Sequence, residues 1–246
     1  MERAPGPTLP GSISDLHAAS GADDAARRSQ RIQILATEHW SLLATRSLSW
    51  NESFSRATMF LTLLSGAVVA LALVAQATSF GEGFVTFALL LLPVVLFMGC
   101  ATFVRLAEVN NEDAYWVTGM NRLRMAYLEL DPELAPYFVT GITDDTVGLM
   151  RTYATHPGGT ILHGFVTTPA TIAFVNAALA AVLVVIVSMQ WQMGMVPGGA
   201  IIGAITFVIA IAVQTAFVWR GAKNYEIEQR IPTPVGFGPG RDEPAG

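Results

Sequence analysis

A polar stretch near the middle of the chain holds two carboxylates one helical turn apart, Glu108 and Glu112. Side chains four residues apart lie on the same face of an α-helix. Two carboxylates placed in this way can bind a cation or take part in acid–base chemistry. They can equally form ion pairs on a solvated face, with Arg105 or with a neighbouring helix. Asn110 and Asp113 complete this predicted polar cluster.

The other residue types used in catalysis show no recognisable arrangement. The four histidines, at positions 17, 39, 156 and 163, do not form the HxxxH or HExxH spacing of a zinc site. Cys100 is the only cysteine, which excludes an intrachain disulfide and a CxxC redox pair. Glycine-rich nucleotide-binding motifs and the GxSxG nucleophile motif are absent. The sequence therefore predicts no enzyme, no cofactor, no metal site and no nucleic-acid partner.

Four long apolar segments separate the polar parts of the chain. Hydrophobic residues make up 52% of the 246 residues and charged residues only 13%, about half the charged share of a typical soluble domain. About 20 apolar residues cross the hydrocarbon core of a bilayer as a helix. The segments of this kind without Asp, Glu, Lys or Arg are 57–80, 84–104, 165–189 and 197–218. The predicted fold class is all-α integral membrane, with four transmembrane helices as two hairpins and long amphipathic cytoplasmic extensions.

The distribution of positive charge predicts the orientation of these spans. All fourteen Lys and Arg residues lie before the first span, between the second and the third, or after the fourth. The two short connections on the other side carry none. Because loops rich in Lys and Arg stay on the cytoplasmic side, both termini are predicted to be cytoplasmic, in a multi-pass protein of the cell (inner) membrane. Thirteen of the fourteen are Arg, which indicates a GC-rich, bacterial genome.

The segment before the first span, 22–56, is predicted to be a long amphipathic helix. Ile32, Leu35, His39 and Leu43 follow helical spacing, and no Pro or Gly interrupts the segment. The helix either lies flat on the membrane surface or stands in the cytoplasm, packed against other helices.

The remaining polar segments are predicted from their start and stop signals. The central segment, 105–164, continues the second span as a helix, and Asp131-Pro132-Glu133 ends that helix and starts another. Asp145 belongs to a capping signal for a further short helix. A helical extension, 219–230, follows the fourth span. The end segments 1–21 and 231–246 are predicted to be disordered tails.

Uncharged polar residues inside the spans are candidates for a pore lining or for contacts between helices. Serine and threonine hydroxyls often bond back to a carbonyl of their own helix. Asparagine and glutamine amides are costlier to bury and are expected to contact another helix or water. These candidates are Thr62, Ser65, Asn176, Thr206 and Gln214.

Small residues at four-residue spacing predict close approach of helices, either within one subunit or between subunits. They are Gly66 and Ala70 in the first span, Ala173, Ala177 and Ala181 in the third, and Gly199 and Gly203 in the fourth.

The absence of charge from all four spans argues against proton pumps and voltage sensors, which place ionisable groups at membrane depth. The hydroxyl-bearing spans, the small-residue stripes and the long helices predict a homo-oligomeric ion channel or channel-like protein with a cytoplasmic helical vestibule. The alternative is a membrane-anchored scaffold or regulatory protein that recruits a cytoplasmic partner, and a second alternative is a small transporter. The predicted partners are the lipid bilayer, further copies of the chain and a cytoplasmic protein.

Overall fold

The computed structural model describes residues 13–153, 167–190 and 196–224, and in this part of the chain all regular structure is helical. Four helices are long and apolar enough to cross a membrane, as the sequence predicts. The elements are α1 (Ile13–Thr78), α2 (Glu82–Leu130), the 3-10 helix η1 (Pro132–Tyr137), α3 (Thr146–Thr152), α5 (Thr168–Gln190) and α6 (Val196–Asn224).

Two of these helices are much longer than a bilayer is thick. At 1.5 Å per residue, the 66 residues of α1 extend about 100 Å and the 49 residues of α2 about 75 Å. The hydrocarbon core of a bilayer is only about 30 Å thick. Each of the two therefore continues far beyond its apolar segment, and we call residues 22–56 and 105–130 together the polar half of the α1–α2 pair.

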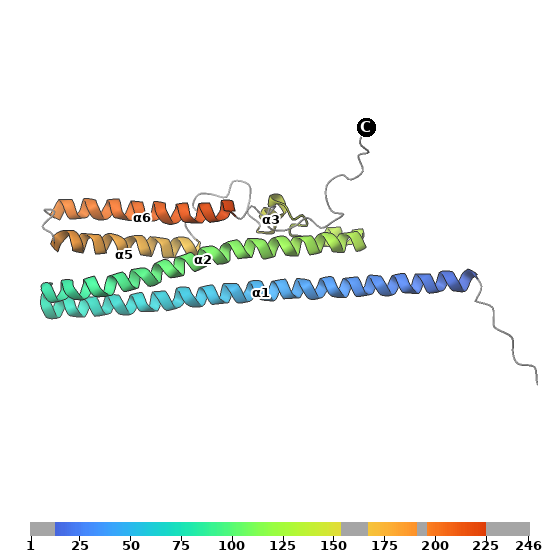
Figure 1. Ribbon diagram of the computed structural model, residues 1–246, viewed down its shortest axis with the longest axis horizontal. Helices are drawn as coiled ribbons and strands as arrows, with labels where there is room; N and C mark the ends of the chain where they lie inside the picture. The colour runs from blue at the N-terminus through green and yellow to red at the C-terminus, as the bar shows by residue number, and fades with distance from the viewer. Residues whose placement is uncertain (1–12, 154–166, 191–195, 225–246) are drawn as a thin grey trace, which may run out of the picture.

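A tight turn joins α1 to α2. Ser79 and Phe80 have positive φ values of 47° and 59°. The Phe80 N–H donates to the carbonyl of Ala75 at 3.1 Å, which is the long hydrogen bond of a Schellman helix ending. Phe80 also contacts Phe84 edge to face, with ring centroids 5.4 Å apart. The turn reverses the chain, so that α2 runs back along α1 (Figure 1).

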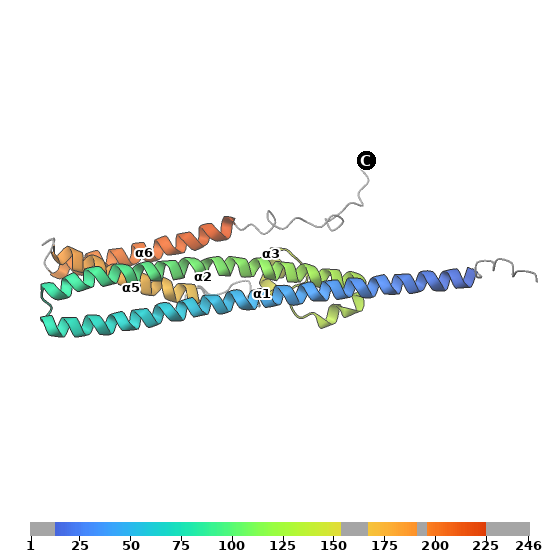
Figure 2. The ribbon, with the colours of Figure 1, turned by 60° about the horizontal axis from the view of Figure 1, so that its bottom comes forward.

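The four long helices are arranged as a row rather than as a closed bundle. α1 packs on α2, α5 packs on α2 and on α6, and α1 and α6 lie on opposite sides of the row in both views (Figures 1 and 2). The buried centre is built from small and apolar residues, including Ala88 and Val95 of α2 and Ala177 of α5, all fully buried. As a result α1 and α6 each expose one long face.

The start of α1 differs from the predicted boundary. The helix begins at Ile13, nine residues before the expected start at Ala22, so the tail predicted for 1–21 is partly helical. A single glycine, Gly21, costs a helix only about 1 kcal/mol, and Leu16 with its neighbouring alanines favours the helix on its other side. Residues 1–12, 154–166, 191–195 and 225–246 lie outside the described residues, and so do the predicted C-terminal tail and the end of the 219–230 extension.

Most of the segment 22–56 lies along the polar half of α2, and the start of α1 runs past the end of α2 (Figure 1). The packed face of this segment differs from the predicted one: Leu35, His39, Leu42 and Arg46 are partly buried, whereas Ile32 and Leu43 are exposed. The reason is that a polar residue on α2 receives Arg46, so the packed face follows complementary polarity instead of hydrophobicity alone. The caps at Asp131 and Asp145 are confirmed: the two carboxylates accept hydrogen bonds from the backbone N–H groups of Glu133 and Gly148.

Candidate functional site

The most densely bonded polar group in the described part of the chain is the carboxylate of Asp113, which is only 3% exposed. From α1, Arg46 Nε donates to Asp113 Oδ1 at 2.5 Å, and Trp50 Nε1 donates to the same oxygen at 2.7 Å. A second Arg46 nitrogen reaches Oδ2 at 3.2 Å. Tyr153, which follows α3, donates its hydroxyl to Oδ2 at 2.6 Å. One side chain of α2 thus ties together α1, α2 and the end of α3.

The ionisation states in this cluster follow from its hydrogen bonds and its burial. The hydrogen bond to Asp113 raises the pKa of Arg46, against the opposing effect of burial. Burial first, and then the hydrogen bond to Asp113, raise the pKa of Tyr153. The guanidinium therefore stays charged and the phenol stays a donor. Each of the two oxygens of Asp113 accepts two hydrogen bonds, so this carboxylate has little capacity left to act as a base or a cation ligand. Its role is to hold the helices in one arrangement.

A second polar centre lies two turns further along α2, at Asn121, which is fully buried. Its amide nitrogen donates to the carbonyl of Thr143 at 3.0 Å, and its carbonyl oxygen accepts from Arg124 at 2.6 Å and from Thr152 at 3.0 Å. Arg124 also reaches the carbonyl of Gly141 at 3.3 Å. Burial, and then the charge of Arg46, lower the pKa of Arg124. Asn121 thereby fixes the segment 138–153 against α2.

The carboxylates singled out by their spacing, Glu108 and Glu112, are engaged by Arg105. The distances from the Arg105 guanidinium are 3.0 Å to Glu112, 3.4 Å to Glu108 and 3.4 Å to Glu52 of α1. Glu52 in turn pairs with Arg56 at 2.9 Å. The structure therefore favours the ion-pair alternative at this face over cation binding.

The predicted polar cluster is split by the helix. Asp113 faces α1, while Glu108 and Asn110 are exposed. Within residues 13–153, 167–190 and 196–224, no group of three or more His, Cys, Asp or Glu side chains could hold a metal ion. The hydrogen bonds of Asp113 and Asn121 make the site a set of polar contacts between elements.

Inside the spans, the two amides predicted to make polar contacts meet each other. Asn176 of α5 is 2% exposed and donates to Gln214 Oε1 of α6 at 3.3 Å. Gln214 donates to the carbonyls of Ala173 at 3.1 Å and Ala210 at 3.2 Å. The Asn176 Oδ1 atom makes no hydrogen bond and lies against Gly99 of α2, where a Cβ atom would overlap it. The amide hydrogen bonds link α5 to α6, and the Asn176 side chain packs against α2.

The three hydroxyl candidates bond back to their own helices. Thr62 donates to the carbonyl of Thr58 at 2.9 Å, Ser65 to that of Leu61 at 2.8 Å, and Thr206 to that of Ile202 at 2.9 Å. Thr62 and Ser65 lie on the exposed side of α1.

The predicted small-residue stripes differ in whether they pack against another helix of the subunit. Gly203 lies against Val185 of α5, where a Cβ atom would come within 2.7 Å of a methyl group, and Gly199 is buried beside it. Ala173 and Ala177 are buried against the core, and Ala181 is half-buried. Gly66, in contrast, is exposed with nothing within 4 Å of a Cβ position, and its stripe partner Ala70 is half-buried. The stripes of α5 and α6 thus pack within the subunit, and Gly66 does not.

The residues that the sequence reasoning missed are the partners of Asp113 and Asn121. Arg46 and Trp50 lie one turn apart, on the face that also carries Leu35 and Leu42, so a charge at a packed position of a long helix was the available signal. The sequence carries no signal for the role of Tyr153, because this residue follows a short helix and lies 40 residues away from Asp113.

Comparison with known proteins adds no relative: no family model, no curated protein and no solved structure matches this chain.

Proposed function

We propose that this protein is the subunit of a homo-oligomeric membrane channel, in which the outward face of α1 lines a water-filled path. The observation that carries the proposal is a polar stripe along α1, on the side opposite the residues packed on α2. Its members are exposed: Asn51, Ser55, Thr58, Thr62 and Ser65 recur every three or four residues, and Gln76 lies on the same face beyond the exposed apolar residues Val69 and Leu73.

The opposite end of the row provides the contrast. The exposed face of α6 carries Ile205, Val208, Ile209 and Val213, each more than half exposed. An aliphatic face is suited to lipid, whereas hydroxyl and amide groups at membrane depth are normally turned toward protein or water. A ring of subunits with α1 inside and α6 outside would satisfy both faces.

The back-bonded hydroxyls suit this role. The hydroxyls of Thr58, Thr62 and Ser65 each donate a hydrogen bond to the carbonyl four residues earlier in the helix. Their oxygens keep lone pairs that can accept hydrogen bonds from water or contact a permeating cation. With no charged side chain at this depth, we expect small ions to pass with little selectivity.

The finer topology belongs to the same proposal. Both termini would be cytoplasmic, and α1–α2 and α5–α6 would cross the membrane as two hairpins. The polar half of the α1–α2 pair, held by Asp113 and Asn121, would then form the wall of a cytoplasmic vestibule. The polar stripe reaches this half at Asn51 and Ser55, so the path would continue into it.

Cysteine accessibility tests the lining. In a Cys100→Ala background, we expect a membrane-impermeant thiol reagent to modify Thr62→Cys and Ser65→Cys in intact membranes and to reduce ion flux in liposomes. Leu63→Cys and Val68→Cys are matched controls, because both positions are exposed but lie away from the stripe, and they should resist the reagent. Protein that is monomeric in mild detergent and leaves liposomes ion-tight would contradict the proposal.

A second candidate function, a membrane-anchored scaffold, has its own observation. Apolar side chains are strongly exposed outside the apolar segments: Tyr137 is 78% exposed, Val139 85% and Val147 73%. Exposed apolar groups of this kind favour a protein partner. A soluble protein recovered at a fixed ratio with the wild type, and lost with Tyr137→Ser and Val139→Ser together, would support this function instead of the channel.

A further inference from the structure

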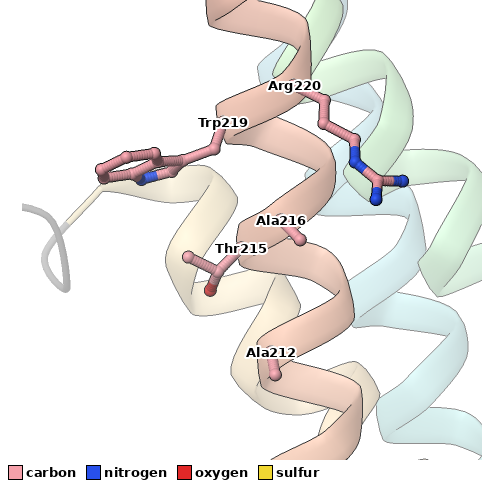
Figure 3. A pocket seen from close by; sticks show the side chains of 5 residues that line it. All are labelled: Ala212, Thr215, Ala216, Trp219 and Arg220. Atoms are coloured by element: carbon pink, nitrogen blue, oxygen red, sulfur yellow. The ribbon is translucent and has the colours of Figure 1, made fainter.

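The outer surface of α6 contains a depression near the end of its apolar segment. Ala212, Thr215 and Ala216 form its floor, and Trp219 and Arg220 form its rim. Figure 3 shows the small side chains in succession along the helix and the two long side chains diverging at their end. Trp219 and Arg220 leave α6 on opposite sides of the helix, so the depression is a shallow, mainly apolar surface with one long side chain on each side of its end.

The position of this depression along the chain matches the edge of a membrane. Arg220 is the first Asp, Glu, Lys or Arg after Arg151, so it marks the place where the last apolar segment gives way to charge. Tryptophan and arginine are typical of that level, where the indole lies among lipid headgroups. Trp219 is 67% exposed there and so is accessible from outside the subunit.

Arg220 lacks the carboxylate partner that four arginines of the described residues have. Arg46, Arg56, Arg105 and Arg122 each pair with a carboxylate. Arg220 is exposed and has no ion pair with any residue in the described ranges. An unpaired guanidinium at a membrane surface is suited to a phosphate group, which it can bind with two parallel hydrogen bonds.

We propose that this depression binds an anionic phospholipid. The phosphate group contacts Arg220, the Trp219 ring lies beside the headgroup and the glycerol esters, and an acyl chain follows the small residues of α6. The small side chains at Ala212 and Ala216 are what leave room for the chain. The site requires only that α6 contacts lipid, so it stands apart from the proposed channel activity.

Thermal unfolding of the purified protein in mild detergent tests the site. We expect phosphatidylglycerol to raise the unfolding temperature in a saturable manner, and phosphatidylcholine with the same acyl chains to raise it much less. Arg220→Gln should weaken the response to phosphatidylglycerol about fivefold, since one arginine near an anionic lipid surface contributes about 1 kcal/mol. Arg151→Gln, which removes another exposed arginine outside the depression, is the matched control and should respond like the wild type.

Fluorescence provides a second measurement that does not depend on Arg220→Gln folding. Brominated phosphatidylglycerol should quench the wild type, and Trp219→Phe should lose part of that quenching while Trp40→Phe keeps it. Inorganic phosphate alone should change neither signal. Equal effects of the two lipids, a full effect of phosphate without lipid, or unchanged quenching in Trp219→Phe would each overturn the proposal.

Discussion

Along the apolar half of the α1–α2 pair, residues 57–78 and 82–104, the two helices meet through small and apolar side chains. Phe60 of α1 packs against Gly99 of α2, and Val95 is fully buried nearby. Along the polar half, the same two helices meet through Arg46, Trp50 and Asp113. The spacing of contacts is that of one continuous helix pair, but the chemistry of the contacts changes where the apolar segments end.

The difference has a physical reason. In hydrocarbon, helices gain nothing from excluding water. They associate through close van der Waals contact and a few hydrogen bonds between amide side chains. In water, a buried carboxylate must be fully bonded to offset its desolvation, and once bonded it specifies a single register. The two halves should therefore respond to mutation in opposite ways: the apolar half to added volume, the polar half to lost hydrogen bonds.

The largest expected effect is at Asp113. Asp113→Ala leaves a guanidinium, an indole and a phenol without their acceptor and should lower the free energy of unfolding by about 3 kcal/mol, the low end for a broken buried pair because Arg46 is 30% exposed. Glu108→Ala is the control on the same helix and should cost little, since its pair with Arg105 is exposed. Thermal or denaturant unfolding in detergent measures both, and equal losses would remove the contrast.

Added volume tests the apolar half. A methyl group at Gly99 would overlap Asn176 Oδ1 and lie 2.8 Å from the Phe60 ring, so Gly99→Ala should cost about 2 kcal/mol through overpacking. Gly66→Ala places the same methyl group where nothing lies within 4 Å. It should not lower the free energy of unfolding of the detergent-purified protein and should raise it by up to about 1 kcal/mol, because alanine favours a helix more than glycine does. A comparable loss of stability in both variants would contradict the expected difference between the two glycines.

The cap of α3 is the next smaller contribution. Asp145 accepts from the Gly148 N–H at 2.8 Å and from the Thr143 hydroxyl at 2.6 Å. Asp145→Ala should cost about 1 kcal/mol, whereas Asp145→Asn keeps a capping oxygen and should cost much less. Proteolysis of the segment 138–153 reports the change directly. Faster cleavage in the asparagine variant as well would point to the charge rather than to the cap.

The amide pair of the spans should couple only weakly. A double-mutant cycle of Asn176→Ala and Gln214→Ala is expected to give a coupling of about 0.6 kcal/mol, the average for such contacts inside a membrane protein. The cycle of Arg46→Ala and Asp113→Ala should give a clearly larger value, because its groups are charged. Equal couplings would show that the polar contacts of the two halves do not differ in strength.

The smallest effect is a pH dependence at His39. Burial, and then the positive charge of Arg124, lower the pKa of His39 below 6.5. The folded state therefore resists a proton that the unfolded chain accepts, so stability is full above about pH 6.5 and declines as the pH falls through the lowered pKa. Unfolding temperatures at pH 7.5 and 5.5 should differ less in His39→Gln than in the wild type or in His17→Gln.

Much of the fold could be predicted because its signals are local. The lengths of uncharged apolar sequence predict four helices that can cross a membrane, and the acids at Asp131 and Asp145 predict where short helices begin. The start of α1 at Ile13 differs from the predicted start because Gly21 is a weak boundary signal. A glycine destabilises a helix but does not end it. Helix ends without strong caps are set by small free-energy differences.

The sequence by itself determined which parts of the chain are apolar, helical and capped, since each of these properties depends on neighbouring residues. Only the tertiary structure decided which residues of a sequence pattern make contacts with other helices. It paired Arg46 and Tyr153 with Asp113 across 67 and 40 residues, left Glu108 exposed, and placed Gly99 in contact and Gly66 out of contact. The reason is register: two long helices can slide past each other by a turn without changing their local sequence preferences, and only the packed arrangement selects which side chains meet.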